Sequence, residues 1–231
     1  MTTPRTIGRI LITGGGSGLG AAVAAAVRAA GGLPLVLDRD VSGVPQDAYE
    51  VDVSDTMAVT RTVEQAVREH GGLDGVVTAA GIDRCGALQD VPAQEWEKVI
   101  AVNLLGTAAV ARAALPALFE SHGRLVTVAS SLALRAVGDA TAYCASKFGV
   151  LGFSRALAAE TRGRMGVTTL VPAGMKTRFF DDRDERYKPT DDSRLNDPAA
   201  VADAVVFALG QPAGCEVREL VICHEEEESW P

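Results

Sequence analysis

Short runs of apolar residues recur along the chain, and longer Ala-rich or amphipathic stretches separate them. Short β-branched or aliphatic runs next to Gly, Asp or Ser are typical of buried strands. The pattern predicts strands at residues 9–13, 33–37, 49–51, 75–78, 124–129, 167–171 and 218–223.

The stretches between these strands carry helix signals. They are rich in Ala and Leu, and glycine pairs at 31–32 and 71–72 mark two helix ends. We expect Ser54 to cap the helix that runs from it to His70. The other predicted helices span residues 19–30, 93–119 (as one helix or two), 142–162 and 198–209.

Strand and helix alternate from one end of the chain to the other, which is the pattern of a parallel sheet covered by helices on both faces. The chain has 231 residues with no internal repeat and no Pro/Ser-rich linker, so its length suits one domain. We therefore expect residues 1–231 to form a single α/β domain, a three-layer doubly wound parallel sheet of the Rossmann type with about seven strands.

One stretch lacks this regularity. Residues 178–196 hold eleven charged residues in nineteen and show little periodicity. One interpretation is an exposed loop. Because the stretch lies between a strand and a helix close to the candidate chemistry, the other is a substrate lid over residues 178–197.

The charge balance excludes several partners. The formal net charge is -8, whereas binding to nucleic acid or to an anionic membrane needs a basic surface. Residues 1–9 lack the apolar run of a signal peptide, and the most apolar stretch, residues 18–27, is too short to span a bilayer. We expect a soluble, cytoplasmic protein.

Cysteine and histidine are scattered, without C-x-x-C or H-E-x-x-H spacing. This distribution predicts buried or half-buried thiols in a reducing compartment and no metal site. The residues concerned are Cys85, Cys144, Cys215, Cys223, His70, His122 and His224.

A glycine-rich sequence, TGGGSGLG, occupies residues 13–20 between the first predicted strand and the first helix. Glycine lets the backbone turn tightly and approach a pyrophosphate, while the N–H groups at the helix start face the anion. Read loosely, Gly16, Gly18 and Ala21 also fit the G-x-G-x-x-G/A pattern. This context predicts a dinucleotide site.

Asp38 closes the second predicted strand, eighteen residues beyond Gly20. A carboxylate there can accept hydrogen bonds from the adenosine ribose and repels a 2′-phosphate. The cofactor expected is therefore NAD rather than NADP, although Arg39 could soften this preference.

Candidate catalytic groups follow the fifth predicted strand. Tyr143 and Lys147 are four residues apart at the start of a helix and project from the same face. An ammonium group next to a phenol stabilises the phenolate and lowers its pKa. Ser130 lies just past the strand, where a hydroxyl can reach a substrate carbonyl, and Ser131 is the competing candidate.

The combination of TGGGSGLG, Asn103-Leu-Leu-Gly106, Ser130 and YCASK resembles the short-chain dehydrogenases/reductases, single-domain branch, in order and spacing over residues 9–223. The resemblance implies that Tyr143 is the general acid/base and that Lys147 lowers its pKa and holds the nicotinamide ribose. It also implies that Ser130 binds the substrate oxygen and that Asn103 bends its helix and anchors a water.

The resemblance further implies cofactor contacts by the phosphate-loop glycines, by Asp52 in VDVSD and by the segment PAGMKT. Together with the residues named above, the expected cofactor-binding set is Gly14, Gly16, Ser17, Gly18, Leu19, Gly20, Asp38, Arg39, Asp52, Val53, Ala79, Ala80, Gly81, Val102, Tyr143, Lys147, Pro172, Ala173, Gly174, Met175 and Thr177.

Three positions depart from the family pattern. Thr78-Ala79-Ala80-Gly81 stands where the family often has Asn-Asn-Ala-Gly, so the usual side-chain amide is missing. Ala173 replaces a glycine, with Gly174 beside it. The C-terminal CHEEEESWP replaces a frequent Asp-Gly-Gly ending.

The function expected is NAD-dependent hydride transfer to or from an alcohol or carbonyl substrate whose identity stays open. The alternative is a dinucleotide-binding regulator or redox sensor on the same fold. We expect a homodimer or homotetramer. The glutamates at 225–228 are either a solvated end or an acidic docking tail.

Overall fold

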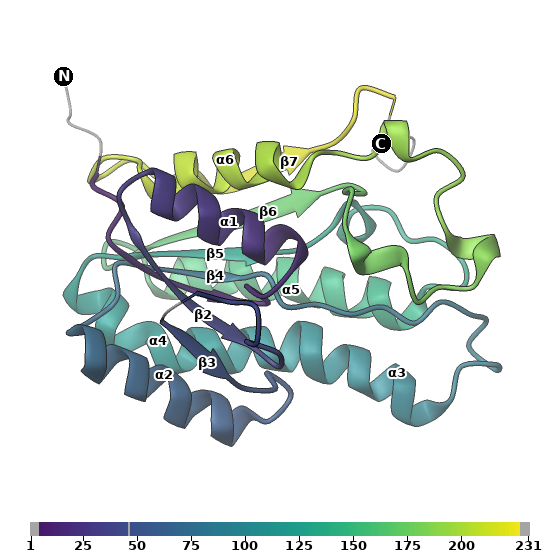
Figure 1. Ribbon diagram of the computed structural model, residues 1–231, viewed down its shortest axis with the longest axis horizontal. Coiled ribbons are helices and arrows are strands. Elements are labelled where there is room, and N and C mark those ends of the chain that lie inside the picture. Colours follow the sequence, from purple (N-terminus) through teal and green to yellow (C-terminus); the bar gives the residue numbers. More distant parts are fainter. Residues whose placement is uncertain (1–4, 46, 227–231) are drawn as a thin grey trace.

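The computed structural model describes residues 5–45 and 47–226 and contains a parallel sheet covered by helices on both faces (Figure 1). Its strands run in the order β3-β2-β1-β4-β5-β6-β7. The fold expected from the sequence is therefore confirmed. The strand bounds are β1 Arg9–Thr13, β2 Leu33–Asp38, β3 Ala48–Glu50, β4 Gly75–Thr78, β5 Arg124–Val128, β6 Gly166–Pro172 and β7 Glu219–Ile222.

The helices lie within two residues of their expected bounds. They are α1 Gly18–Ala29, α2 Thr56–His70, α3 Ala93–Ile100, α4 Thr107–Glu120, α5 Thr141–Glu160 and α6 Pro198–Leu209. Between α3 and α4 the chain forms a π-helix over Ala101–Gly106, so the long helical stretch has three parts. Most of the acidic C-terminal tail lies outside the described residues.

The predicted cap of α2 is wrong. Asp55, not Ser54, is the N-cap, and its carboxylate accepts hydrogen bonds from the N–H groups of Met57 and Ala58. The Ser54 hydroxyl instead donates to Asp52 at 2.7 Å. Both residues have a capping side chain, and the chain turns one residue later than the sequence suggests.

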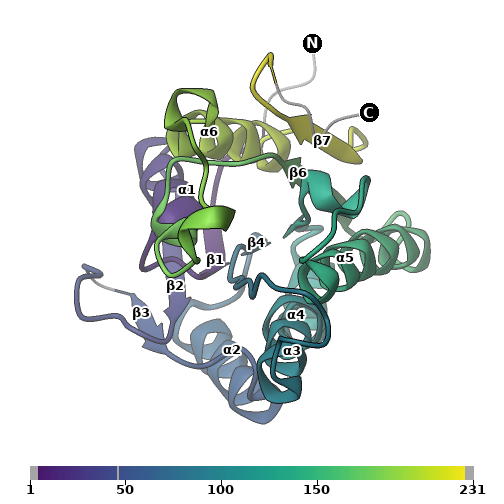
Figure 2. The ribbon, with the colours of Figure 1, turned by 90° about the vertical axis from the view of Figure 1, so that its right-hand side faces the viewer.

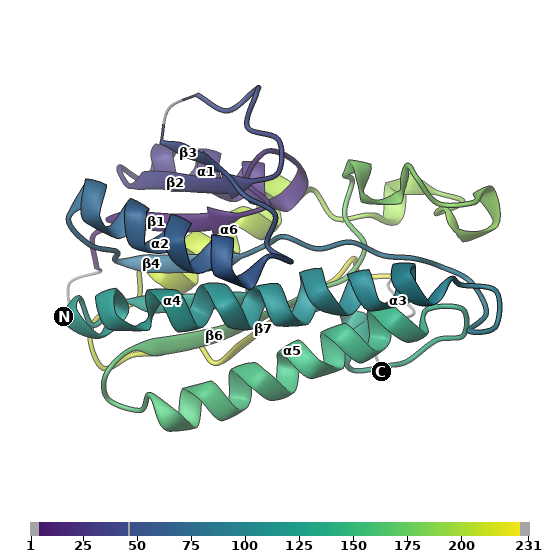
Figure 3. The same cartoon turned by 90° about the horizontal axis from the view of Figure 1, so that it is seen from below.

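Alternate strand residues enter two separate cores. Leu11 packs with α2, α4 and α5 on one face, while Ile10 and Ile12 pack with α1 and α6 on the other. Burial on both faces explains why the strands are continuous apolar runs. Figure 2 looks along the strands and shows the two helix layers, with α1 and α6 on one face of the sheet and α2, α4 and α5 on the other. Figure 3 shows α2, α4 and α5 on the near face.

The helical stretch Ala93–Glu120 is long and apolar enough, by composition alone, to cross a membrane. It is longer than residues 18–27, the stretch expected from the sequence to be the most apolar. In the structure Val99, Val110 and Leu118 of this stretch are fully or almost fully buried. Val110 and Leu118 belong to the core that α4 shares with the sheet, so this is the position of a core helix.

The strand order reverses at β1, which pairs with β2 on one side and with β4 on the other. Connections then leave the sheet in opposite directions from the carboxyl ends of β1 and β4. A crevice opens at such a switch point, and ligands of doubly wound sheets bind there.

Candidate active site

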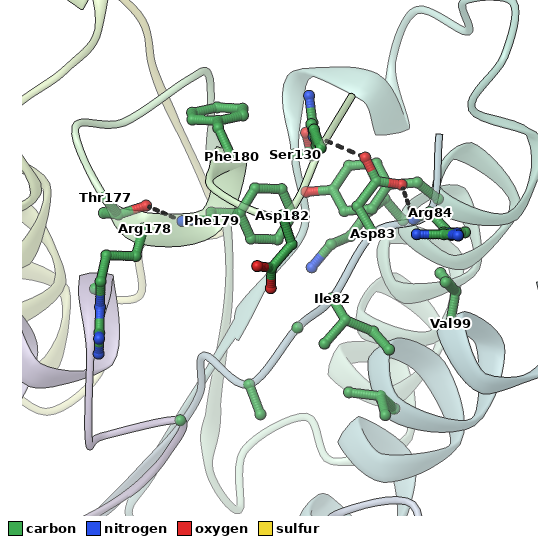
Figure 4. Close-up of a pocket in the computed structure, with 18 of the residues that line it drawn as sticks. Ile82, Asp83, Arg84, Val99, Ser130, Thr177, Arg178, Phe179, Phe180 and Asp182 are labelled. Carbon is green, nitrogen blue, oxygen red and sulfur yellow. Dashed lines mark hydrogen bonds and ion pairs between the residues drawn. The ribbon is translucent and has the colours of Figure 1, made fainter. Parts of the chain in front are cut away.

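A cleft of about 1250 Å³ lies at the carboxyl ends of the strands. It is lined by the glycine-rich loop, by the segments after β4, β5 and β6, and by residues 177–184, 186 and 187. Figure 4 shows its central part, with Ser130 on one side and Thr177, Arg178 and Phe179 on the other. The volume exceeds the ~300–1,000 Å³ of ordinary small-ligand pockets, as a dinucleotide together with a substrate requires.

The start of α1 provides backbone donors at one end of the cleft. The N-cap residue Ser17 makes no side-chain capping hydrogen bond, and the first turn holds no acidic residue. By contrast, Asp55 caps α2 and Asp197 caps α6 through their carboxylates. The N–H groups at the start of α1 therefore remain available to an anion, and the helix dipole favours negative charge there.

Glycine is required at two positions of this loop by geometry. Gly14 has φ +69°, and a Cβ on it would lie 2.9 Å from the Cα of Ala80. A Cβ on Gly20 would collide with the carbonyl oxygen of Gly14. The loop can thus fold back against the end of β4 only without these side chains. The cradle left by the glycines and the free helix start fits a pyrophosphate.

Two acidic residues line the cleft, and one of them is hydrogen-bonded to the glycine-rich loop. The Asp38 carboxylate accepts hydrogen bonds from the N–H groups of Gly16 at 2.8 Å and Asp40 at 3.2 Å. Asp52 accepts from both the N–H and the hydroxyl of Ser54, and these bonds lower the pKa of Asp52. Both carboxylates and Arg39 line the cleft.

Tyr143, Lys147 and Ser130 come together in the middle of the cleft. The Lys147 Nζ lies 5.6 Å from the centre of the Tyr143 ring and donates to the carbonyl of Val128 at 2.8 Å. The Ser130 side chain is hydrogen-bonded to Tyr143, and its Oγ accepts from the N–H of Leu132 at 3.1 Å. Both serine candidates are buried and line the cleft, and the hydrogen bond of Ser130 lowers the pKa of Tyr143.

Burial dominates the titration of both groups in the cofactor-free protein. It raises the pKa of Tyr143 to about 12, against the lowering effect of the Ser130 hydrogen bond. It lowers the pKa of Lys147 to about 8, because a buried ammonium loses its hydration. The sequence led us to expect a lowered tyrosine pKa, and desolvation is the reason for the difference.

Asn103 lies in the π-helix and is buried. Its Oδ1 accepts from the N–H of Ile82 at 2.8 Å, and its Nδ2 donates to the Ile82 carbonyl at 2.9 Å and to the Ser146 Oγ at 3.0 Å. The local bend expected of its helix is present as this π-helix. Asn103 thereby fixes the segment after β4 and connects it to α5.

The segment that lacks the family's side-chain amide begins with a buried, unpaired hydroxyl. Thr78 Oγ1 is buried and has no hydrogen-bond partner among the described residues. Ala80 instead donates its N–H to the Thr13 Oγ1 at 3.1 Å. The ends of β1 and β4 are therefore joined through Thr13, which supplies part of the support that the sequence leaves unassigned.

Most residues expected from the sequence line this cleft, and two do not. Gly16 donates its N–H to Asp38, which lines the cleft, and Asn103 is hydrogen-bonded to Ile82, which also lines it. Those that line it are Gly14, Ser17, Gly18, Leu19, Gly20, Asp38, Arg39, Asp52, Val53, Ala79, Ala80, Gly81, Val102, Ser130, Tyr143, Lys147, Pro172, Ala173, Gly174, Met175 and Thr177.

Asp83 is a residue of the cleft that was not expected from the sequence. This residue follows β4 by five positions and forms a 2.7 Å ion pair with Arg183 of the segment 178–196. Its position just past a strand end was the available signal, because such positions line the crevice. The partner could not be inferred, since it lies one hundred residues further along the chain.

The four cysteines are free thiols, and Cys215 is exposed rather than buried or half-buried as expected. Cys85 lies in the cleft and its Sγ is 3.2 Å from the Asp83 Oδ2. No group of three His, Cys, Asp or Glu side chains suited to a metal ion occurs in the part of the chain that the structure describes.

The sequence profile of the family described as short chain dehydrogenase matches residues 8–188. The chain belongs to this family of oxidoreductases. It is 31% identical over 224 residues to an uncharacterized oxidoreductase of Staphylococcus aureus (strain MRSA252), covering 92% of this chain and 95% of that protein. It is 32% identical over 225 residues to the D-threitol dehydrogenase of Mycolicibacterium smegmatis, covering 88% and 86%.

A solved structure shares the fold. The alcohol dehydrogenase from Thermococcus sibiricus, complexed with 5-hydroxy-NADP, matches with a TM-score of 0.87 at 24% identity and covers 96% of this chain and 98% of its own. Together these comparisons confirm the resemblance to short-chain dehydrogenases drawn from the motifs.

Proposed function

We propose that this protein is an NAD-dependent oxidoreductase that transfers a hydride between the nicotinamide and an alcohol or carbonyl substrate. The observation that carries the proposal is the convergence of Tyr143, Ser130 and Lys147 in the same cleft as the uncapped start of α1. One part of the cleft suits a dinucleotide, and the other suits proton transfer to a small substrate.

The nicotinamide, when bound, supplies the hydride chemistry. Ser130 donates a hydrogen bond to the substrate oxygen and orients it toward Tyr143. Tyr143 takes a proton from an alcohol, or gives one to a carbonyl oxygen, at its phenolic oxygen. Lys147, held by the Val128 carbonyl, keeps positive charge beside the ring and offers donors to the ribose.

The uncharged Tyr143 of the free protein suits the reduction direction, in which it donates its proton. For alcohol oxidation, the positive charge of oxidised nicotinamide would favour the phenolate, by the opposite-charge effect that lowers an acid's pKa. A turnover assay of Tyr143→Phe tests the assignment. We expect loss of turnover with NAD binding retained, and a Phe variant with near-normal turnover would refute it.

NAD is proposed over NADP because Asp38 lies at the end of β2 and lines the cleft. A carboxylate in this place accepts bonds from ribose hydroxyls and repels a 2′-phosphate. The Thermococcus sibiricus enzyme was solved with 5-hydroxy-NADP, so this preference is a property we assign to this chain's Asp38. Equal kcat/KM with both coenzymes would overturn it.

The substrate proposed is a small alcohol or its ketone, and polyols are the first class to test because one relative is a D-threitol dehydrogenase. The assay follows NADH absorbance with a panel of alcohols and ketones. Activity on any member supports the proposal. Tight NAD binding without turnover on the whole panel would favour a regulator or redox sensor.

We also propose that the enzyme is cytoplasmic and forms a homodimer or homotetramer. The apolar side chains of Leu105 and Phe148 are 51% and 44% exposed, which suits contact with a second copy. Gel filtration with light scattering tests this, and a monomer at micromolar concentration would contradict it.

A further inference from the structure

The segment from Arg178 to Asn196 crosses the cleft and is held at both its base and its tip; we call it the lid. At the base, Asn196 donates its N–H and its Nδ2 to the Gly174 carbonyl at 2.9 and 3.0 Å. At the tip, Tyr187 donates its hydroxyl to Asp139 at 2.9 Å. The lid therefore reaches from the end of β6 to the opposite wall of the cleft.

The strongest contact of the tip is the ion pair between Arg183 and Asp83. The Arg183 guanidinium approaches the Asp83 Oδ2 to 2.7 Å, and the two side chains are only 19% and 4% exposed. The same guanidinium lies over the rings of Phe179 and Phe180, at 5.3 and 4.6 Å from their centres. Phe179 in turn lies 5.8 Å from the Tyr143 ring.

These contacts link the ion pair, through Phe179, to the ring of Tyr143. With the pair formed, Phe179 stands beside the phenol and closes the wall of the substrate region. Figure 4 shows Phe179 facing the interior of the pocket and Asp83 on its opposite side. A lid tip without the pair would lose the contact that holds Phe179 in place.

The pair also balances charge beside the phenol. The Asp83 carboxylate raises the pKa of Tyr143, and the Arg183 guanidinium lowers it. Cys144 is the other titratable group that raises it, and the Lys147 ammonium lies 5.6 Å from the ring on α5. An open lid would remove the compensating charge and leave Asp83 facing the site alone.

We propose that Arg183 is a positioning residue of the reaction: its ion pair with Asp83 holds the lid over the substrate and cancels the effect of the Asp83 charge at Tyr143. Lid closure and activation of the general base then depend on the same contact. The kinetic part of this inference rests on the proposed oxidoreductase function, whereas the structural part does not.

One unpaired donor of the lid opposes closure. Arg183 Nε is buried and has no hydrogen-bond partner among the described residues. An unpaired buried donor disfavours the closed form, so the lid can open to admit substrate. Substrate packed against Phe179 shifts the balance toward closure.

The structural arm of the test measures hydrogen–deuterium exchange of the lid amides in the full-length protein. Arg183→Ala and Asp83→Asn should both raise exchange in residues 178–196, and Arg183→Lys should raise it less. Arg194→Ala is the matched control, because Arg194 is a lid arginine whose ion pair with Glu226 is exposed. Unchanged exchange in Arg183→Ala would overturn the proposal whether or not the protein is an oxidoreductase.

The kinetic arm uses alcohol oxidation with saturating coenzyme. Arg183→Ala leaves the Asp83 carboxylate unpaired, and Asp83→Asn leaves the Arg183 guanidinium without its counter-charge. Both variants should therefore raise the substrate KM, by about tenfold. The pH profiles of the two variants should shift in opposite directions from that of the wild type. The acid limb of kcat/KM should move to higher pH in Arg183→Ala and to lower pH in Asp83→Asn.

This opposite movement separates a positioning role from a structural one. A residue that merely supports the fold would move both variants in the same direction or neither. Shifts of equal sign, or no shift in either variant, would therefore overturn the coupling between the lid and Tyr143. Absence of any turnover in the wild type would refute the proposed function, while the exchange experiment would still decide on the lid.

Discussion

The carboxylate of Asp38 accepts a 2.8 Å hydrogen bond from the backbone N–H of Gly16, so the end of β2 is joined to the turn of the glycine-rich loop. Gly16 is therefore part of the site although it does not line the cleft. We propose that this carboxylate, besides shaping the loop, also discriminates between coenzymes.

Asp38→Asn tests this double role. The amide keeps an oxygen for the Gly16 N–H but removes the negative charge, so NADP should be accepted better. We expect the ratio of kcat/KM for NAD to that for NADP to fall by about tenfold or more, from loss of charge repulsion at close range. Asp40→Asn is the control, because Asp40 is exposed and its carboxylate bonds to Ser42. A ratio equally altered in both variants would contradict the assignment.

Tyr143 should stay protonated to high pH in the coenzyme-free protein. Its pKa is raised to about 12, and the charged phenolate is the form that burial disfavours. Ultraviolet titration at the tyrosinate band, with Tyr143→Phe subtracted, should show no signal from this residue below roughly pH 11. Saturation with NAD should move the titration to lower pH. A normal titration near the free-tyrosine value would contradict the burial argument.

Much of the fold followed from the sequence because its signals are local. The apolar run at β1 and the glycines after it determine a strand and a turn that no distant residue needs to specify. The spacing of Tyr143 and Lys147 placed both on one helix face for the same reason. These features depend only on neighbours along the chain.

Other features depend on contacts between distant segments. Asp83 and Arg183 each look like solvated charges in the sequence, and only the path of the lid brings them together. Asn103 is hydrogen-bonded to Ile82, twenty-one residues earlier in the chain, and no periodicity of apolar residues reveals this contact. The pKa of Tyr143 depends on total burial, which is likewise a property of the folded chain.

At the N-terminus of α2, Ser54 and Asp55 can be compared directly as candidates for the N-cap. Asp55→Ala removes the carboxylate that accepts from the N–H groups of Met57 and Ala58. The free energy of unfolding should fall by about 1 kcal/mol, as for other N-cap replacements. Ser54→Ala should affect stability less and raise the KM for NAD, because Ser54 bonds to the Asp52 carboxylate. Urea denaturation and coenzyme kinetics measure the two effects, and the reverse pattern would restore Ser54 as the cap.

Asn103 provides the last test, since its side chain satisfies both backbone groups of Ile82, next to Asp83. Asn103→Ala leaves these partly buried backbone groups without their partner, at a cost of about 1–3 kcal/mol in total. Ser146→Ala is the matched control, because it removes the other partner of the Asn103 amide and leaves Ile82 paired. Urea denaturation should show a larger loss for Asn103→Ala, and its lid amides should exchange faster because Asp83 follows Ile82. Equal losses in the two variants would mean that the bonds to Ile82 do not fix this side of the cleft.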